Sequence, residues 1–108
     1  MEWASRTGTT ALIAMPQGRI DETSWEAFLE GLSGAIKQAE SAGLPLILDL
    51  AGVAYMSSRG LRVLTIAKRE AGERNVTLTL ARPNHRITEI LGISRYDRLF
   101  VVTQSLEA

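Results

Sequence analysis

Apolar positions recur at helical spacing in two long segments of the chain. Thr23, followed three residues later by Glu26, has the pattern of a capping box, so we expect the first helix to begin there and to end at Ala42-Gly43. Its apolar positions are Trp25, Phe28, Leu29, Leu32, Ile36 and Ala39. The second helix has Leu61, Val63, Leu64, Ile66, Ala67 and Ala71 and closes over residues 72–75. Both patterns predict a helix with one buried face.

Four shorter segments have the patterns of strands. They are residues 9–15, which lead up to Pro16 and Gly18, and residues 45–50, 76–80 and 99–102. Residues 45–50 are almost continuously apolar, which is typical of a strand covered on both faces, so we expect them at the centre of a sheet. A short third helix is expected over His85–Leu91, after a turn at residues 82–84.

Strands that alternate with helices predict an α/β fold. We expect a mixed sheet of four to five strands with its helices packed on one face. Because the chain has 108 residues, 45% of them apolar, and no internal repeat or linker, we expect a single domain over residues 1–108, monomeric when free. One core is expected, with contributions from Leu12, Ile13, Trp25, Phe28, Leu32, Ile47, Leu48, Leu50, Leu61, Leu64, Leu78, Leu80 and Leu91.

Charge balance and the length of the apolar runs narrow the range of partners. Twelve Lys and Arg residues balance twelve Asp and Glu residues, so the positive excess expected of a protein that binds nucleic acid is missing. The longest apolar runs are far shorter than the roughly 20 residues of a membrane-spanning helix, and residues 1–6 do not resemble a signal peptide. We therefore expect no nucleic acid partner, no membrane partner and a cytoplasmic location.

Side chains typical of catalysis are sparse. The segment Ser57-Ser58-Arg59-Gly60 lacks the first glycine of a G-x-S-x-G nucleophile turn, and the single histidine, His85, has no obvious acidic partner near it in the sequence. The chain has no cysteine, no recognisable metal-ligand spacing and no phosphate-binding G-x-x-x-x-G-K-S/T loop. We expect no metal, no cofactor and no enzymatic activity.

The adjacent hydroxyls of Ser57 and Ser58 stand where the loop after the central strand meets the second helix. A structural interpretation is that one of them caps the helix by accepting a hydrogen bond from a backbone N–H, a contact worth about 1 kcal/mol. A regulatory interpretation is that an exposed serine here receives a phosphate, which the helix dipole and the free N–H groups tolerate. The two interpretations are compatible, and the residues alone leave both open.

The order and spacing of several short segments are more specific than any one of them. These segments are Gly18–Asp21, Ile47–Leu50, Val53–Leu64, Val76–Pro83, Ile90–Ile93 and Asp97–Phe100. In this order they resemble the STAS family over nearly the whole chain. Anti-sigma factor antagonists of that family generally carry Asp-Ser-Ser-Gly in the loop, and the first serine is phosphorylated. Aligned on Gly60, the motif puts Ser57 on the acid, Ser58 on the phosphorylated serine and Arg59 on the second serine.

The resemblance implies a partner-switching protein controlled by phosphorylation. Unphosphorylated, it would bind an anti-sigma factor that is also a serine protein kinase; phosphorylation of Ser58 would release that partner, and a serine phosphatase would reset the switch. The protein is then a substrate and not a catalyst. The implied partner-binding residues are Asp21, Tyr55, Met56, Ser57, Arg59 and Gly60. For Asp21, a purely structural role near the first helix stays open.

An alternative is a constitutive, non-phosphorylated STAS-like subunit with a regulatory or structural role, for example in a transport complex. In that case the serine pair would serve only as a helix cap. The two alternatives differ in what they require of Ser58, which must accept a phosphate in the first and need not do so in the second.

Overall fold

The computed structural model describes residues 1–106, and these form an α/β fold around one mixed sheet. Its strands are β1 (Glu2–Thr7), β2 (Leu12–Ile20), β3 (Leu46–Asp49), β4 (Val53–Met56), β5 (Leu78–Ala81) and β6 (Val101–Thr103). The order is β1-β2-β3-β5-β6, and β4 pairs with the second half of β2. Only β1 runs antiparallel to its neighbour among these described strands. The mixed sheet and the central position of β3 are confirmed, but six strands replace the expected four to five.

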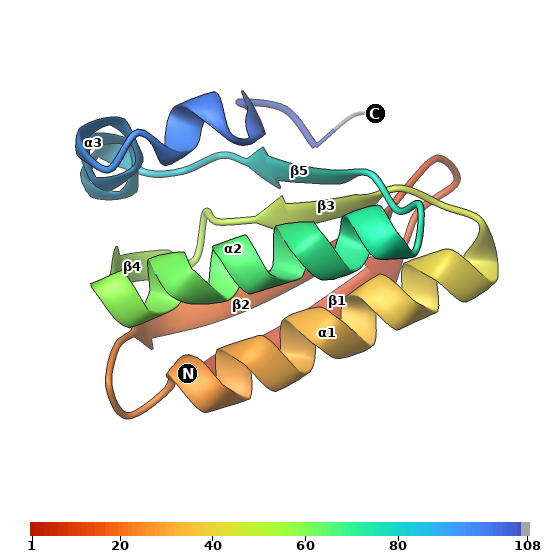
Figure 1. Cartoon of the computed structure of the whole chain (residues 1–108), viewed down its shortest axis with the longest axis horizontal. Helices are drawn as coiled ribbons and strands as arrows, with labels where there is room; N and C mark the ends of the chain where they lie inside the picture. The colour runs from red at the N-terminus through yellow and green to blue at the C-terminus, as the bar shows by residue number, and fades with distance from the viewer. Residues whose placement is uncertain (107–108) are drawn as a thin grey trace.

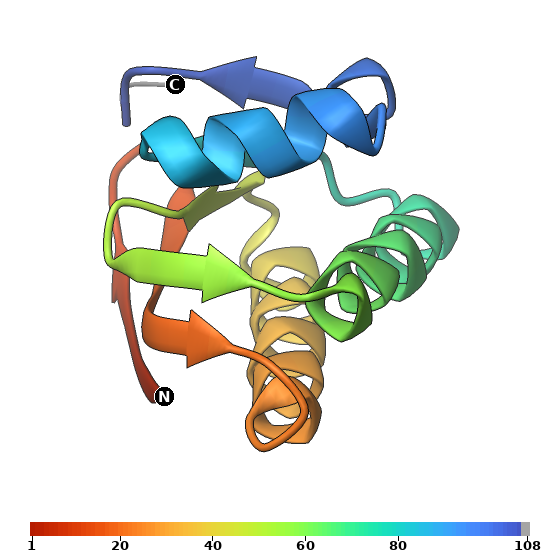
Figure 2. The ribbon, with the colours of Figure 1, turned by 90° about the vertical axis from the view of Figure 1, so that its left-hand side faces the viewer.

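Helices α1 (Trp25–Ala42) and α2 (Ser58–Glu73) lie side by side over one face of the sheet, as expected (Figures 1 and 2). The shorter α3 (His85–Ile93) packs beside β4 at the end of the sheet, and a 3-10 turn, η1 (Tyr96–Arg98), leads into β6. Gly43, with φ at 67°, ends α1 in the left-handed conformation that glycine adopts without strain. None of the described helices combines the length and the apolar composition needed to cross a bilayer.

Strand β2 continues through Pro16 and Gly18, where the sequence pattern predicts its end. Its first part, at residues 12–14, pairs with β3, and its last part, at residues 18–20, pairs with β4. Pro16 lies between the two paired parts, so on that side of β2 its missing N–H breaks no ladder hydrogen bond. The prediction that this strand stops at residue 15 is therefore wrong.

The buried strand side chains form two clusters. Leu12, Leu48 and Leu80 belong to the larger cluster, together with the buried residues of α1 and α2. The smaller cluster consists of Ala11, Ile13, Ile47 and Ala81. Successive side chains of a strand point to opposite faces of the sheet, so Ile13 and Ile47 cannot share a core with their neighbours Leu12 and Leu48. The expectation of a single core is wrong for these two residues.

Candidate functional site

The candidate site lies where β2 and β4 end and α1 and α2 begin. These two strands are parallel, with Ile20 opposite Met56, so their carboxyl ends meet at one edge of the molecule. The backbone N–H of Ser57 donates to the carbonyl oxygen of Ile20 at 2.8 Å, which ties the two strand-to-helix connections together. Figure 2 looks onto this end of the molecule, and the first turns of both helices lie near the viewer.

The carboxylate of Asp21 organises the turn before α1. Its Oδ1 accepts hydrogen bonds from the hydroxyl of Thr23 at 2.8 Å and from the N–H of Thr23 at 3.0 Å. These bonds hold the pKa of Asp21 below its ordinary value, so the carboxylate is ionised at neutral pH. The capping box predicted from Thr23 and Glu26 is wrong, because Ser24 is the N-cap residue and the Thr23 hydroxyl donates to Asp21 instead. Asp21 thus has a structural role in its own turn.

The two serines before and within the first turn of α2 have different environments. Ser57 is the N-cap residue, yet its hydroxyl makes no capping hydrogen bond, and its Oγ is buried without a partner among the described residues. Ser58 is the first residue of α2 and is exposed, and its hydroxyl makes no hydrogen bond within residues 1–106. Neither serine therefore acts as the side-chain cap that the structural interpretation requires.

Two arginines at this end of the molecule, Arg59 and Arg19, each combine an aromatic contact with an ion pair. The guanidinium of Arg59 lies 5.2 Å from the centre of the Trp25 ring, and its Nε lies 3.2 Å from Glu22 Oε2. These contacts join the start of α2 to the start of α1, which a serine at position 59 could not do. Arg19 lies 4.6 Å from the centre of the Tyr55 ring, and its Nε is 3.7 Å from Asp21 Oδ2.

The structure brings Asp21, Tyr55, Ser58 and Arg59 to the surface of this end of the molecule. Met56 and Gly60 are buried at the same end of the molecule. They can therefore support the loop by packing beneath it but are not exposed to a partner. Three further residues that contact this surface were not predicted from the sequence, namely Arg19, Glu22 and Trp25. The Gly18–Asp21 segment contains Arg19, but the contacts of Trp25 and Glu22 depend on the approach of two helices.

The side chains of Met56 and Ile20 pack so closely against position 60 that only glycine fits there. A Cβ at this position would overlap Met56 Cγ and lie 2.9 Å from Ile20 Cγ2. At Gly72, near the other end of α2, a Cβ would meet no heavy atom within 4 Å. The same substitution at the two positions therefore separates the packing effect from the helix propensity.

We expect Gly60→Ala to lower the free energy of unfolding by about 1–3 kcal/mol, as overpacking of a dense site does. Gly72→Ala should raise it by up to about 1 kcal/mol, because alanine favours the helix more than glycine does. Chemical denaturation of both variants measures the difference. Equal stability of the two variants would show that Gly60 has room for a side chain.

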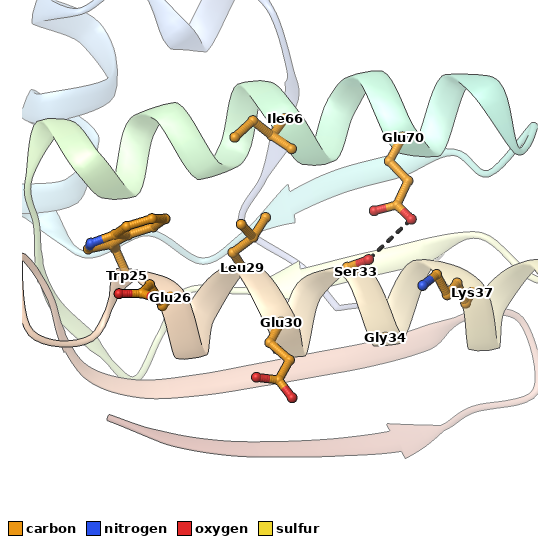
Figure 3. A pocket seen from close by; sticks show the side chains of 9 residues that line it. All are labelled: Trp25, Glu26, Leu29, Glu30, Ser33, Gly34, Lys37, Ile66 and Glu70. Atoms are coloured by element: carbon orange, nitrogen blue, oxygen red, sulfur yellow. Dashed lines mark hydrogen bonds between the residues drawn. The ribbon is translucent and has the colours of Figure 1, made fainter.

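A shallow groove runs between α1 and α2, beginning at the candidate site (Figure 3). Trp25, Leu29 and Ile66 line its apolar half. In its other half the hydroxyl of Ser33 donates to Glu70 Oε2 at 3.1 Å, and Arg74 donates to the same oxygen at 3.2 Å. Arg74 also donates to Glu40 Oε1 of α1 at 3.0 Å. The Ser33–Glu70 and Arg74–Glu40 bonds, with the Arg59 contacts at the other end, connect α1 to α2.

The next feature is the set of side chains that could act as a general base or bind a metal ion. His85 is exposed at the start of α3, and its Nε2 lies 2.6 Å from Glu89 Oε1, so the expectation that it lacks an acidic partner nearby in the sequence is wrong. No hydroxyl forms a hydrogen bond with this imidazole within residues 1–106. The same part of the chain contains no group of three or more His, Cys, Asp or Glu side chains placed to hold a metal ion.

A family model of the STAS domain matches residues 2–108, so the chain belongs to the STAS family. Among curated proteins, BtrV of Bordetella bronchiseptica, assigned as an anti-sigma factor antagonist, is 29% identical over 97 residues. That match covers 90% of this chain and 81% of BtrV.

Solved structures of low sequence identity share the fold. A protein of Thermotoga maritima assigned as an anti-sigma factor antagonist superposes with a TM-score of 0.83 at 15% identity, covering 96% of this chain and 87% of that one. The anti-sigma factor antagonist SpoIIAA in its unphosphorylated form has a TM-score of 0.76 at 17% identity, covering 98% and 90%. Phosphorylated SpoIIAA, of Bacillus, has a TM-score of 0.68 at 17% identity, covering 98% and 94%.

Proposed function

We propose that this chain is an anti-sigma factor antagonist that switches partners through phosphorylation of Ser58. Unphosphorylated, it binds an anti-sigma factor that is also a serine kinase. Phosphorylation by that kinase releases the complex, and a serine phosphatase restores the binding form. In this proposal the chain is a single domain over residues 1–108 that acts in the cytoplasm as a monomer when free, and it is the substrate of both enzymes.

The difference between the two serine hydroxyls carries the proposal. A kinase must bring the γ-phosphate in line with the attacking hydroxyl, so the acceptor oxygen has to be accessible. Ser58 is exposed and its hydroxyl is free of hydrogen bonds among the described residues, whereas Ser57 Oγ is buried. Accessibility therefore supports Ser58 as the acceptor, in agreement with the register of the family motif.

The surface around Ser58 supports a role in docking. Arg59 directly follows the acceptor and lies against the Trp25 ring, and Tyr55 lies three residues before the acceptor against Arg19. Aromatic residues and arginine are enriched at protein interfaces. Asp21 shapes the adjacent turn. Of the remaining residues expected in this surface, Ser57, Met56 and Gly60 hold the loop and the start of α2 in place through burial and backbone hydrogen bonds.

Relatives support the same function. BtrV, assigned as an anti-sigma factor antagonist, matches most of this chain. SpoIIAA, which has the same fold, exists in an unphosphorylated and a phosphorylated form. The alternative of a constitutive subunit treats the serine pair as a helix cap, and the absence of a side-chain capping bond at the start of α2 removes that reason for the pair.

The phosphate is expected to spoil an interface without unfolding the free protein. It adds a charge of about −1.5 to −2, and at a helix N-terminus an anion is stabilised by the dipole. In a complex the same group would have to lose its hydration shell or oppose the partner. The switch therefore acts on binding while the fold of the free protein persists.

Phosphorylation in vitro followed by mass spectrometry tests the proposal. The protein is incubated with ATP and candidate serine kinases encoded near its gene, and the phosphate is located on the chain. We expect one phosphate on Ser58, retained in Ser57→Ala and lost in Ser58→Ala. A phosphate on Ser57 would contradict the proposal, as would efficient phosphorylation of Ser58→Ala.

A further inference from the structure

Arg62 is the one arginine close to Ser58 along α2 that has no partner of its own. Arg59 is engaged by Glu22 and Trp25, and on the other side of the loop Arg19 is engaged by Tyr55 and Asp21. Arg62 is exposed and makes no hydrogen bond, ion pair or aromatic contact with the part of the chain that the structure describes. Its guanidinium is therefore available to a new anion.

The helix places Arg62 next to Ser58. Residues four apart on an α-helix share a face, with their Cβ atoms about 5–6 Å apart, and an acidic group N-terminal to a basic one is the more favourable order. Ser58 and Arg62 are both exposed positions of α2 with this spacing. Arg59, only one residue from Ser58, instead extends toward α1 through its contacts with Trp25 and Glu22.

We propose that Arg62 is the intramolecular partner of the phosphate on Ser58, a positioning residue that holds the modified side chain along α2. The inference rests on Ser58 being the phosphoacceptor, as proposed above. A guanidinium binds phosphate oxygens through two parallel N–H donors, and this favours the dianion over the monoanion. Phosphorylation would then change the docking surface in two ways. It adds an anion at Ser58, and it engages the guanidinium of Arg62, which is otherwise free to contact a partner.

Within residues 1–106, no neighbouring carboxylate competes with a phosphate on Ser58 for the guanidinium of Arg62. In the turn before α1, Asp21 is bonded to Thr23 and Glu22 is paired with Arg59. Glu26 in the first turn of α1 and Asp97 in η1 form no ion pair with Arg62 among the described residues. The described part of α2 has no acidic residue in its first turn. Arg62 thus meets no competing carboxylate on its own helix near Ser58, and the phosphate has one unengaged cation within a helical turn.

Titration of the phosphate by phosphorus NMR tests the inference. Phosphoserine is incorporated at position 58 during synthesis, so the experiment requires no kinase. At low ionic strength we expect the second pKa of the phosphate to be about half a unit lower in the otherwise wild-type chain than in Arg62→Gln. High salt should reduce this difference, because the contact is exposed. The phosphate pKa of Arg62→Lys should lie between these two values, since lysine keeps the positive charge but cannot donate two parallel hydrogen bonds.

Arg69→Gln is the matched control. Arg69 is an exposed arginine of the same helix, roughly 16 Å along the axis from Ser58 at 1.5 Å per residue, beyond the screening length at physiological salt. At physiological salt, Arg69→Gln should leave the phosphate pKa at the wild-type value, and at low ionic strength it should raise that pKa much less than Arg62→Gln does, because Arg69 lies too far away to form a contact. The inference is overturned if Arg62→Gln also leaves that pKa unchanged, or if Arg69→Gln raises it equally. Failure of kinases to modify Ser58 would instead contradict the proposed function and leave this titration unaffected.

Discussion

Replacing Ser58 by Asp should weaken binding to the anti-sigma partner by roughly thirty-fold to several thousand-fold, whereas Ser58→Ala should bind like the wild type. A carboxylate at the first position of α2 brings a charge to the centre of the proposed interface. Burying an unpaired charge at an interface commonly costs about 2–5 kcal/mol, which corresponds to that range of affinity. Titration calorimetry with the purified partner measures it.

The loss must be separated from misfolding. An acidic residue is favourable in the first turn of a helix, so Ser58→Asp should unfold at the wild-type temperature or slightly above it. Ser57→Ala is the matched serine control and should retain binding, because its Oγ is buried and cannot contact a partner in the free conformation. Equal affinity of the Ala and Asp variants at position 58 would refute a switch that acts through charge.

Truncating Leu48 to Ala should lower the free energy of unfolding by about 2–5 kcal/mol. Leu48 is fully buried in β3, between β2 and β5, and belongs to the larger of the two core clusters. A loss of this size is much of the stability of a small domain. Ile66→Ala is the control, since Ile66 is an aliphatic residue with 38% of its surface exposed, and it should cost less than about 1 kcal/mol. A loss below about half a kcal/mol for Leu48→Ala in chemical denaturation would be incompatible with a central β3.

The elements with strong side-chain patterns could be predicted from the sequence, and the others could not. Both long helices and the central strand are amphipathic or continuously apolar, so burial of their own side chains defines them. Strand β1, at Glu2–Thr7, is largely exposed and is held by backbone pairing with β2, which leaves no hydrophobic signal. Strand β4 has four residues and lies within a segment that reads as a loop.

Part of the site could also be predicted. The register of the family motif selects Ser58, but the physical difference between Ser57 and Ser58 arises only in the folded chain, where the first hydroxyl is buried and the second is exposed. The role of Arg59 likewise depends on the approach of α1 to α2, which brings Trp25 and Glu22 to it. Local sequence carries no information about contacts between segments more than thirty residues apart.

The central claim is that a phosphate on Ser58 changes affinity for the partner while the fold persists. The most direct measurement is titration calorimetry of the partner with the same protein in two states, unmodified and carrying phosphoserine at position 58. We predict a loss of affinity of at least roughly thirty-fold on phosphorylation, with recovery after phosphatase treatment and an unchanged circular dichroism spectrum throughout. Equal affinity of the two states, or loss of the folded spectrum on phosphorylation, would contradict the account.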